Sequence, residues 1–140
     1  MNLKKLSLIA LVSVSVAPNI HALSNPLNEA FIAHQGIGKV EKLITESNVE
    51  INNDNSVNKM TALHWAARRG TVQEVQLLLQ YGANSKLETT NGNTALDLAK
   101  ERLEQEQSKQ GKKRKKSEIE QTKAIVLLLT DDMLVAKVTI

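Results

Sequence analysis

The chain contains no cysteine, only two prolines and only three aromatic residues among its 140 amino acids. Without cysteine it can form neither a disulfide framework nor a thiolate zinc site, and it has no thiol nucleophile. Its three histidines, His21, His34 and His64, are too few for a histidine-rich metal cluster. The hydrophobic content of 41% is nevertheless ordinary for a soluble chain. The composition therefore predicts one ordinary domain with little material for a catalytic centre.

Positive charge is concentrated in the chain rather than spread along it. Six of the 18 basic residues lie between Lys109 and Lys116, and Lys4 and Lys5 are two more. Without these eight, 10 basic residues face 15 acidic ones, which leaves a net charge of −5. A nucleic-acid-binding domain is expected to spread its basic residues over a folded face. The sequence instead predicts an acidic body that carries one basic segment.

The N-terminus has the parts of a secretory signal peptide. A pair of lysines precedes the apolar stretch from Leu6 to Ala17, and the small residue Ala22 precedes a cleavage point at Leu23. The apolar stretch is too short to span a bilayer comfortably, which takes roughly 20 residues. We expect residues 1–22 to be removed and the mature protein to be exported, periplasmic or secreted, and not integral to a membrane. An uncleaved N-terminal anchor is the alternative.

Two segments of the chain repeat, and their spacing of about 33 residues is within the range of solenoid repeats. Thr61-Ala62-Leu63-His64-Trp65-Ala66-Ala67 recurs as Thr94-Ala95-Leu96-Asp97-Leu98-Ala99-Lys100. Between them run apolar residues at helical spacing, with Gly70 and Gly82 each placed to stop a helix. The turn dipeptide Asn91-Gly92 precedes the next threonine. One unit is therefore expected to contain a helix, a tight turn, a second helix and an extended finger with a turn.

These units resemble the ankyrin repeat. The family signature Thr-Pro-Leu-His-x-Ala, at a period of about 33 residues, stands here as Thr61 to Ala66, with alanine in place of the usual proline. The resemblance implies an all-α ankyrin-repeat solenoid of about three helix-turn-helix repeats with short finger turns. We place the repeat domain at 23–132, with repeats at approximately 27–59, 60–92 and 93–130, and a C-terminal tail at 133–140.

The two flanking repeats depart from the pattern. The first aligns with the second at a distance of about one repeat but lacks the Thr-Ala-Leu-His start, as is expected of a terminal, capping repeat. The last carries an insertion at approximately 103–118 that continues the first helix and breaks at Gly111. Doubling a loop costs only about 0.6 kcal/mol in closure entropy, so the repeat can accommodate the insertion. Within it lies the basic run, which we define as Lys112, Lys113, Arg114, Lys115 and Lys116.

His64 and Trp65 are expected to be structural. The imidazole of His64, near a helix start, can bond the Thr61 hydroxyl or nearby backbone, and Trp65 is expected to pack between neighbouring inner helices. Acidic pairs such as Asp131-Asp132 have no histidine, serine or metal-ligand partner at a meaningful spacing, and the chain has no glycine-rich phosphate loop. The sequence therefore predicts no catalytic residue, no cofactor, no metal site and no enzyme activity.

The resemblance implies a non-enzymatic protein-binding module, an adaptor or scaffold, that binds a protein partner of unknown identity and no small-molecule substrate. Arg68 and Arg69 are the leading contact residues, because arginine forms bidentate pairs with carboxylates and is enriched at binding hot spots. A solvated helix end is the alternative interpretation of this pair. The positions that face outward in the family fall on Arg68, Arg69, Glu88, Thr90, Asn91, Asn93, Glu101 and Arg102, and also on His34, Gln35, Val57, Asn58 and Met60.

The basic run leaves three interpretations open. It is a solvated loop, or a patch for acidic partners such as anionic lipid, polyanion or nucleic acid, or a nuclear-localisation signal. The last matters only if the exported chain enters a eukaryotic cell as a secreted effector. A polyanion- or membrane-surface-binding protein that works through Lys112–Lys116 is therefore the alternative to the protein-binding module. A salt titration distinguishes these two hypotheses, because the affinity of a ligand that binds through the basic run should fall steeply with ionic strength.

Overall fold

The computed structural model describes residues 25–54, 57–108 and 116–138, with side chains described through Met133. The expected signal peptide at 1–22 and residues 112–115 of the basic run lie outside the described residues. The described residues contain helices and no strand. These are α2 (Pro26–Ile32), α3 (Ile37–Glu46), α4 (Ala62–Arg69), α5 (Val72–Gln80), α6 (Ala95–Ser108) and α7 (Lys116–Val138).

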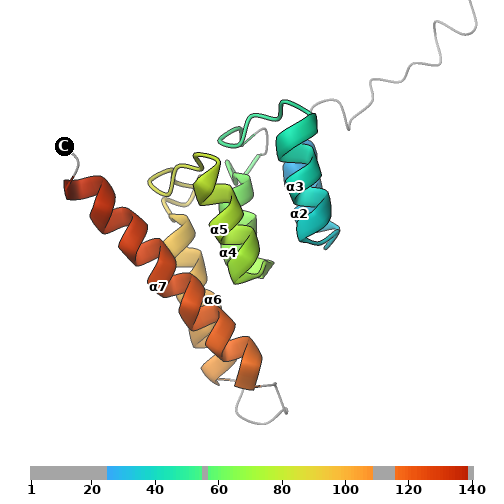
Figure 1. Ribbon diagram of the computed structural model, residues 1–140. Coiled ribbons are helices and arrows are strands. Elements are labelled where there is room, and N and C mark those ends of the chain that lie inside the picture. Colours follow the sequence, from blue (N-terminus) through green and yellow to red (C-terminus); the bar gives the residue numbers. More distant parts are fainter. Residues whose placement is uncertain (1–24, 55–56, 109–115, 139–140) are drawn as a thin grey trace, which may run out of the picture.

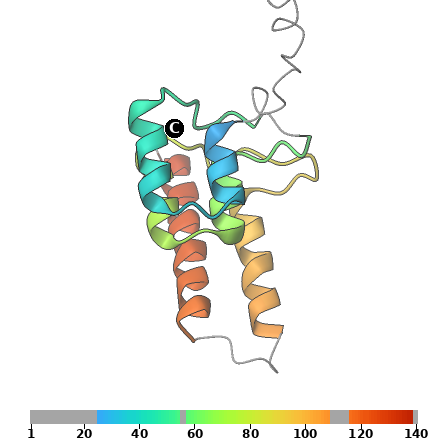
Figure 2. The ribbon, with the colours of Figure 1, turned by 90° about the vertical axis from the view of Figure 1, so that its right-hand side faces the viewer.

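The helices form three antiparallel pairs that stand side by side in chain order (Figure 1). Helices α2, α4 and α6, which we call the inner helices, make one row, and α3, α5 and α7 make a second row beside it (Figure 2). The first finger (residues 47–54 and 57–61) and the second finger (residues 81–94) join successive pairs at one end of the stack. Both fingers project to the side of α2, α4 and α6 (Figure 2). The predicted all-helical solenoid of three repeats is thus confirmed.

Capping interactions determine where the two helices of the second repeat begin. Before α4, the Thr61 N–H donates to Nδ1 of His64 at 3.1 Å, and the Thr61 hydroxyl lies 2.8 Å from the same nitrogen. Before α5, the Thr71 N–H donates to Oε2 of Glu74 at 2.8 Å, and the Glu74 N–H donates back to the Thr71 hydroxyl at 3.4 Å. These bonds satisfy N–H groups that a helix start leaves free. The predicted contact between His64 and the Thr61 hydroxyl is confirmed.

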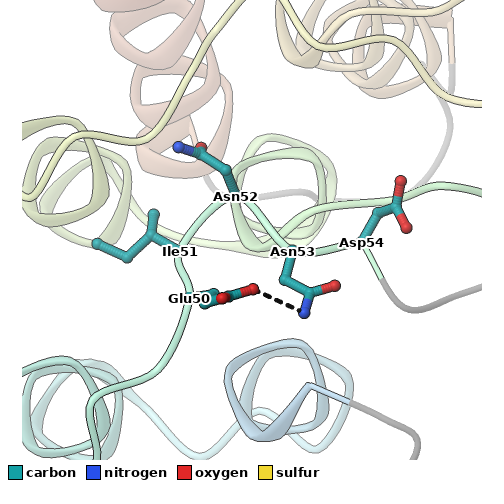
Figure 3. A pocket seen from close by; sticks show the side chains of 5 residues that line it. All are labelled: Glu50, Ile51, Asn52, Asn53 and Asp54. Carbon is teal, nitrogen blue, oxygen red and sulfur yellow. Dashed lines mark hydrogen bonds between the residues drawn. The ribbon is translucent and has the colours of Figure 1, made fainter.

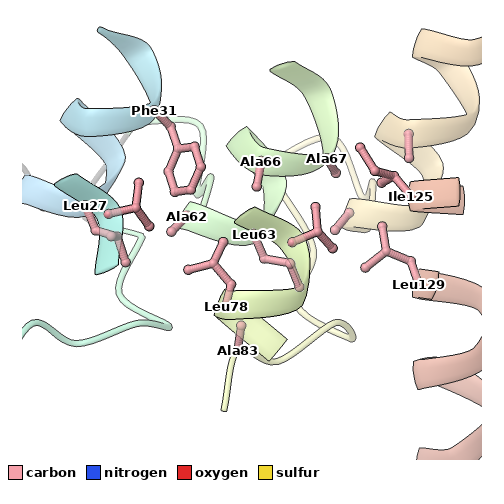
Figure 4. Close-up of a cluster of buried hydrophobic side chains, with 14 of the residues drawn as sticks. Leu27, Phe31, Ala62, Leu63, Ala66, Ala67, Leu78, Ala83, Ile125 and Leu129 are labelled. Atoms are coloured by element: carbon pink, nitrogen blue, oxygen red, sulfur yellow. The ribbon is translucent and has the colours of Figure 1, made fainter. Parts of the chain in front are cut away.

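One apolar core runs through the stack between the two rows of helices (Figure 4). Its largest buried aliphatic side chains come from all three pairs and include Leu27, Leu63, Leu78, Ile125 and Leu129. Ala66 and Ala67 on α4 have no exposed surface, and their small size lets the neighbouring inner helices approach closely. Each pair therefore buries its apolar face against its neighbours, as a repeat protein must.

Polar groups tie neighbouring fingers together. The side-chain amide of Asn52 in the first finger donates to the carbonyl of Gly82 at 3.1 Å and accepts from the N–H of Asn84 at 2.7 Å. Nearer the tips, the Thr90 N–H donates to the carbonyl of Asn58 at 3.0 Å. These bonds join residues about one repeat apart, so they hold the two fingers side by side.

The described parts of the insertion in the last repeat are additional helix. Helix α6 continues to Ser108 and α7 begins at Lys116, and both extend beyond the other helices at the end opposite the fingers (Figure 1). Helix α7 also continues to Val138, so residues 133–138 of the expected C-terminal tail prolong the helix, and residues 139–140 lie outside the described residues. The physical reason is that the chain has no glycine or proline after Gly111 to end it.

Lys59 in the first finger adopts a left-handed backbone conformation, with φ of 51°. One repeat later the equivalent position is Gly92, with φ of 77°. A side chain in this region costs roughly 1–2 kcal/mol, which exceeds the larger entropy that glycine loses on folding. We expect Lys59→Gly to raise the free energy of unfolding by about 0.5 kcal/mol in a urea titration. The reverse control, Gly92→Ala, should lower it by about 1 kcal/mol; no gain from Lys59→Gly would contradict the conformational explanation.

Candidate protein-interaction surface

The candidate site is the side of the stack formed by the exposed side chains of α2, α4 and α6 together with the tips of the two fingers. We call this side the inner face. The fingers project past the row of inner helices, so the fingers and the helices meet at an angle (Figure 2). Hydrogen bonds join the two fingers to each other. The buried alanines of α4 let the inner helices pack closely. The inner face is therefore assembled from three repeats and is presented on rigid elements.

Arg68 and Arg69 occupy the last turn of α4 on the inner face, and both are exposed. The guanidinium of Arg69 lies 5.7 Å from the centroid of the Trp65 ring, a cation–π geometry worth about 0.5–1 kcal/mol at exposed sites. Trp65 itself is half-buried and packs against the core. Within the described part of the chain, Arg68 has no hydrogen-bond, ion-pair or ring partner. Of the two arginines, Arg68 is thus the one whose guanidinium contacts no partner among the described residues.

Arg102 does not face outward as the sequence predicted. Its Nε donates to Oε1 of Glu106 at 2.9 Å and its Nη1 donates to the carbonyl of Gly70 at 3.0 Å, and only 19% of its side chain is exposed. The expectation is wrong because α6 continues beyond the point where α4 ends, so Glu106 is available one turn further on. Arg102 therefore ties the last repeat to the turn between α4 and α5. The spacing of four residues between Arg102 and Glu106 is the sequence signal that indicates this pair.

The structure places the remaining predicted contact residues in three ways. Met60 is buried, with 4% of its surface exposed, and its carbonyl accepts from the side-chain amide of Asn28 at 3.1 Å. The predicted outward position of Met60 is therefore wrong, because this residue lies beside α2 rather than at the finger tip. Asn93 is half-buried. The exposed residues are His34, Gln35, Val57, Asn58, Glu88, Thr90, Asn91 and Glu101.

The tip of the second finger is a hydrogen-bonded turn. The Thr89 N–H donates to the carbonyl of Asn93, and the Gly92 N–H donates to the carbonyl of Thr89, both at 2.9 Å. The turn predicted at Asn91-Gly92 is therefore confirmed. It leaves the side chains of Thr90 and Asn91 exposed beside the first finger, where a partner could reach both.

His64 is a buried ionisable group behind the inner face, with 1% of its surface exposed. Because Nδ1 accepts from the Thr61 N–H, the proton of the neutral ring sits on Nε2, which lies 3.0 Å from the carbonyl of Leu87 and donates to it. Burial lowers the pKa of His64, and the backbone groups of Leu87 and Asn93 and the charge of Asp54 oppose this only in part. The histidine therefore joins the start of α4 to the second finger in its neutral form.

Stability is expected to fall as the pH drops below about 6.5, the ordinary pKa of histidine. Since the pKa of His64 is lower in the folded protein, the unfolded chain takes up the proton first, and the free energy of unfolding decreases until the folded pKa is passed. The pKa of Asp97, the equivalent group in the last repeat, is lowered by hydrogen bonds from Thr94. The stability that Asp97 contributes is therefore present above its ordinary pKa of 3.8 and lost only at still lower pH.

Urea unfolding of the wild type and of His64→Asp between pH 8 and pH 5 measures this dependence. The variant carries at position 64 the aspartate that the last repeat has at Asp97. Its free energy of unfolding should therefore change little between pH 8 and pH 5, even if it is lower than that of the wild type at every pH. An unchanged acid dependence in His64→Asp would show that another group is responsible.

A shallow, open pocket lies in the first finger (Figure 3). Its lining residues are Glu50, Ile51, Asn52, Asn53 and Asp54. The side chain of Asn53 donates to the Glu50 carboxylate at 3.1 Å, and the amide of Asn25 donates to the carbonyls of both residues. These bonds hold the start of α2 against the finger, so this pocket has a structural explanation.

The described residues contain no group of three or more His, Asp or Glu side chains placed to hold a metal ion. None of their helices is both long enough and apolar enough to cross a membrane.

Helix pairs stacked with fingers on one side define a helical repeat protein of the protein-binding class. Residues 30–107, more than half of the chain, match the family model described as ankyrin repeats (3 copies). The chain therefore belongs to the ankyrin-repeat family.

The chain is similar to segments of much larger proteins. It is 44% identical over 66 residues to ankyrin repeat domain-containing protein 40 of Mus musculus, which covers 47% of this chain and 18% of that protein. It is 43% identical over 61 residues to the palmitoyltransferase ZDHHC17 of Homo sapiens, and this match covers 44% of this chain and 10% of that protein. It is also 52% identical over 42 residues to the probable E3 ubiquitin-protein ligase XBOS34 of Oryza sativa subsp. japonica, and this match covers 30% of this chain and 8% of that protein. The chain thus spans less than a fifth of these relatives.

Proposed function

We propose that this chain is an exported, non-enzymatic adaptor or scaffold that binds a protein partner on its inner face. The observation that carries the proposal is the exposed arginine pair at the end of α4, in which Arg68 has no partner among the described residues and Arg69 lies over Trp65. Guanidinium groups near polar finger residues suit an acidic or hydrogen-bonding surface better than an apolar one.

Affinity capture with the mature chain tests the binding part of this proposal. The baits are the wild type, the double variant Arg68→Ala/Arg69→Ala, and the control Lys39→Ala/Lys42→Ala, which removes the same charge from α3. A partner retained by the wild type and the control but lost from the arginine variant supports the proposal. Equal retention by all three baits would place the binding site elsewhere.

Export is proposed from the charge and apolar pattern of residues 1–22. N-terminal sequencing of the protein from the exported fraction should begin at or near Leu23. Leu11→Arg, which places a charge inside the apolar stretch, should retain the protein in the cytosol with its N-terminus intact. Recovery of the wild type from the cytosol with Met1 intact would contradict the proposal and leave a protein-binding module that acts inside the cell.

The basic run supports a second candidate, a polyanion- or membrane-surface-binding protein or a secreted effector. Helix α6 ends at Ser108, ahead of the run, and α7 begins at Lys116, the last residue of the run; both of these helix ends lie on the side of the stack opposite the fingers (Figure 1). A ligand of the basic run would therefore approach a different end of the molecule from a partner of the fingers. A salt titration with anionic vesicles or heparin tests it: affinity should fall steeply with salt and vanish when residues 112–116 are replaced by glutamine.

A further inference from the structure

We propose that the inner face selects a partner segment of mixed charge, with an acidic side chain at the second repeat and a basic side chain about 10 Å further toward the last repeat. This inference rests on the proposed function of the inner face, and it concerns the chemistry of the segment that would bind there.

The second repeat presents positive charge. Arg68 and Arg69 are exposed in the last turn of α4, and no acidic side chain among the described residues pairs with Arg68. In the first repeat, the corresponding exposed residues are His34 and Gln35, neither of which is an arginine or a lysine. A carboxylate of the partner is therefore best placed opposite α4.

The last repeat presents negative charge at the equivalent place. Glu101 stands one repeat after Arg68 and is exposed on α6. Its carboxylate accepts from the neutral side-chain amide of Gln105 at 3.0 Å, so its charge is not cancelled by this bond. Arg102 would neutralise it if both faced outward, but Arg102 is turned inward to Glu106 and Gly70. The tertiary structure thus makes this part of the inner face acidic.

Lys100 does not cancel this charge, because it lies on another side of α6. The residue equivalent to it one repeat earlier is Ala67, which is completely buried where α4 packs on its neighbours. Lys100 is exposed at the corresponding place, where a following repeat would pack. Asp97 is likewise exposed, whereas its equivalent His64 is buried. The charges of Lys100 and Asp97 therefore lie on the side of α6 that corresponds to the packed side of α4, and not on the inner face.

The geometry of the stack determines the spacing of the two partner charges. Packed helices lie about 8–10 Å apart, and an extended chain advances about 3.3–3.6 Å per residue. An acidic and a basic residue separated by three positions in an extended segment therefore match Arg68 and Glu101. A uniformly acidic segment would place a like charge against Glu101, and such contacts select against the wrong partner.

Two synthetic peptides of otherwise equal sequence test the proposal. One carries the pattern Lys-Thr-Thr-Asp-Thr-Thr-Lys, which offers a basic residue to the last repeat in either chain direction, and the other replaces both lysines with aspartate. Binding to the mature chain is measured by fluorescence polarisation at low ionic strength. We expect the wild type to bind the mixed peptide about fivefold more tightly than the acidic one, and Glu101→Arg to reverse this preference. Glu41→Arg, an exposed charge reversal on α3, is the matched control and should leave the preference unchanged.

The variant Arg68→Ala separates failure of this inference from failure of the proposed function. Suppose that both peptides bind more weakly to Arg68→Ala, but that Glu101→Arg leaves the ratio of the two affinities unchanged. The mixed-charge inference is then overturned, and the inner face remains the binding site. If neither peptide binds, or if Arg68→Ala affects neither, both proposals are contradicted. Circular dichroism of each variant verifies that the exposed substitutions leave the fold intact.

Discussion

Replacing Leu78 with alanine is expected to lower the free energy of unfolding by roughly 2–5 kcal/mol. Leu78 lies on α5 in the middle pair, has no exposed surface, and points into the cluster that contains Leu63 and Ala83 (Figure 4). Truncation loses the transfer free energy of the removed atoms and leaves a cavity that the neighbouring helices cannot fill completely. The position is unfavourable for relaxation, because the middle pair is packed on both sides.

The size of this effect is large compared with the whole stability of a domain, which is typically about 5–15 kcal/mol. Urea unfolding followed by circular dichroism measures it, with the exposed Lys86→Ala as the control. If Leu78→Ala is too unstable to fold, Leu78→Met, which nearly conserves volume, should cost less than about 1.5 kcal/mol and remain measurable. A loss in Leu78→Ala no larger than in Lys86→Ala would be incompatible with burial of this side chain.

The double substitution Arg68→Ala/Arg69→Ala is expected to weaken binding of the isolated partner by about thirtyfold or more, which corresponds to more than about 2 kcal/mol. Folding should change far less. Arg68 has no partner among the described residues, and Arg69 contributes only its contact with Trp65, so the loss of stability should stay within about 1 kcal/mol. The structure thus adds a contribution from Arg69 that exposure alone does not predict.

Calorimetry with the single variants divides the effect between the two arginines. Arg68→Ala should lose affinity without a change in melting temperature, whereas Arg69→Ala should lower both slightly, because it also removes the cation–π contact. Trp65→Leu tests that contact, since Arg69→Ala should cost less stability when the indole ring is already absent. Unchanged affinity in the double variant, with loss only when Lys112–Lys116 are neutralised, would favour the polyanion-binding alternative.

The sequence by itself determined the repeating architecture, because the interactions that define each unit are local. Thr61 and His64 are three residues apart and cap α4 wherever the helix packs, and the Asn91-Gly92 turn forms from its own backbone bonds. The repeated pattern of buried alanines and leucines then leaves one way for the pairs to stack. The exposed positions of Arg68, Glu88 and Glu101 follow from the resemblance to the ankyrin repeat, whose outward positions were carried over to these residues.

Only the tertiary structure decided which of the outward positions remain available. Arg102 is drawn inward because a carboxylate of the prolonged α6 and a carbonyl of the preceding repeat meet at its guanidinium. Met60 is buried because α2 of the first repeat lies against it and Asn28 holds its carbonyl. In both cases the contacts that decide the outcome include groups about one repeat away, which the repeat period cannot specify. The charge of the inner face is therefore a property of the folded stack, since it depends on which side chains the neighbouring repeats engage.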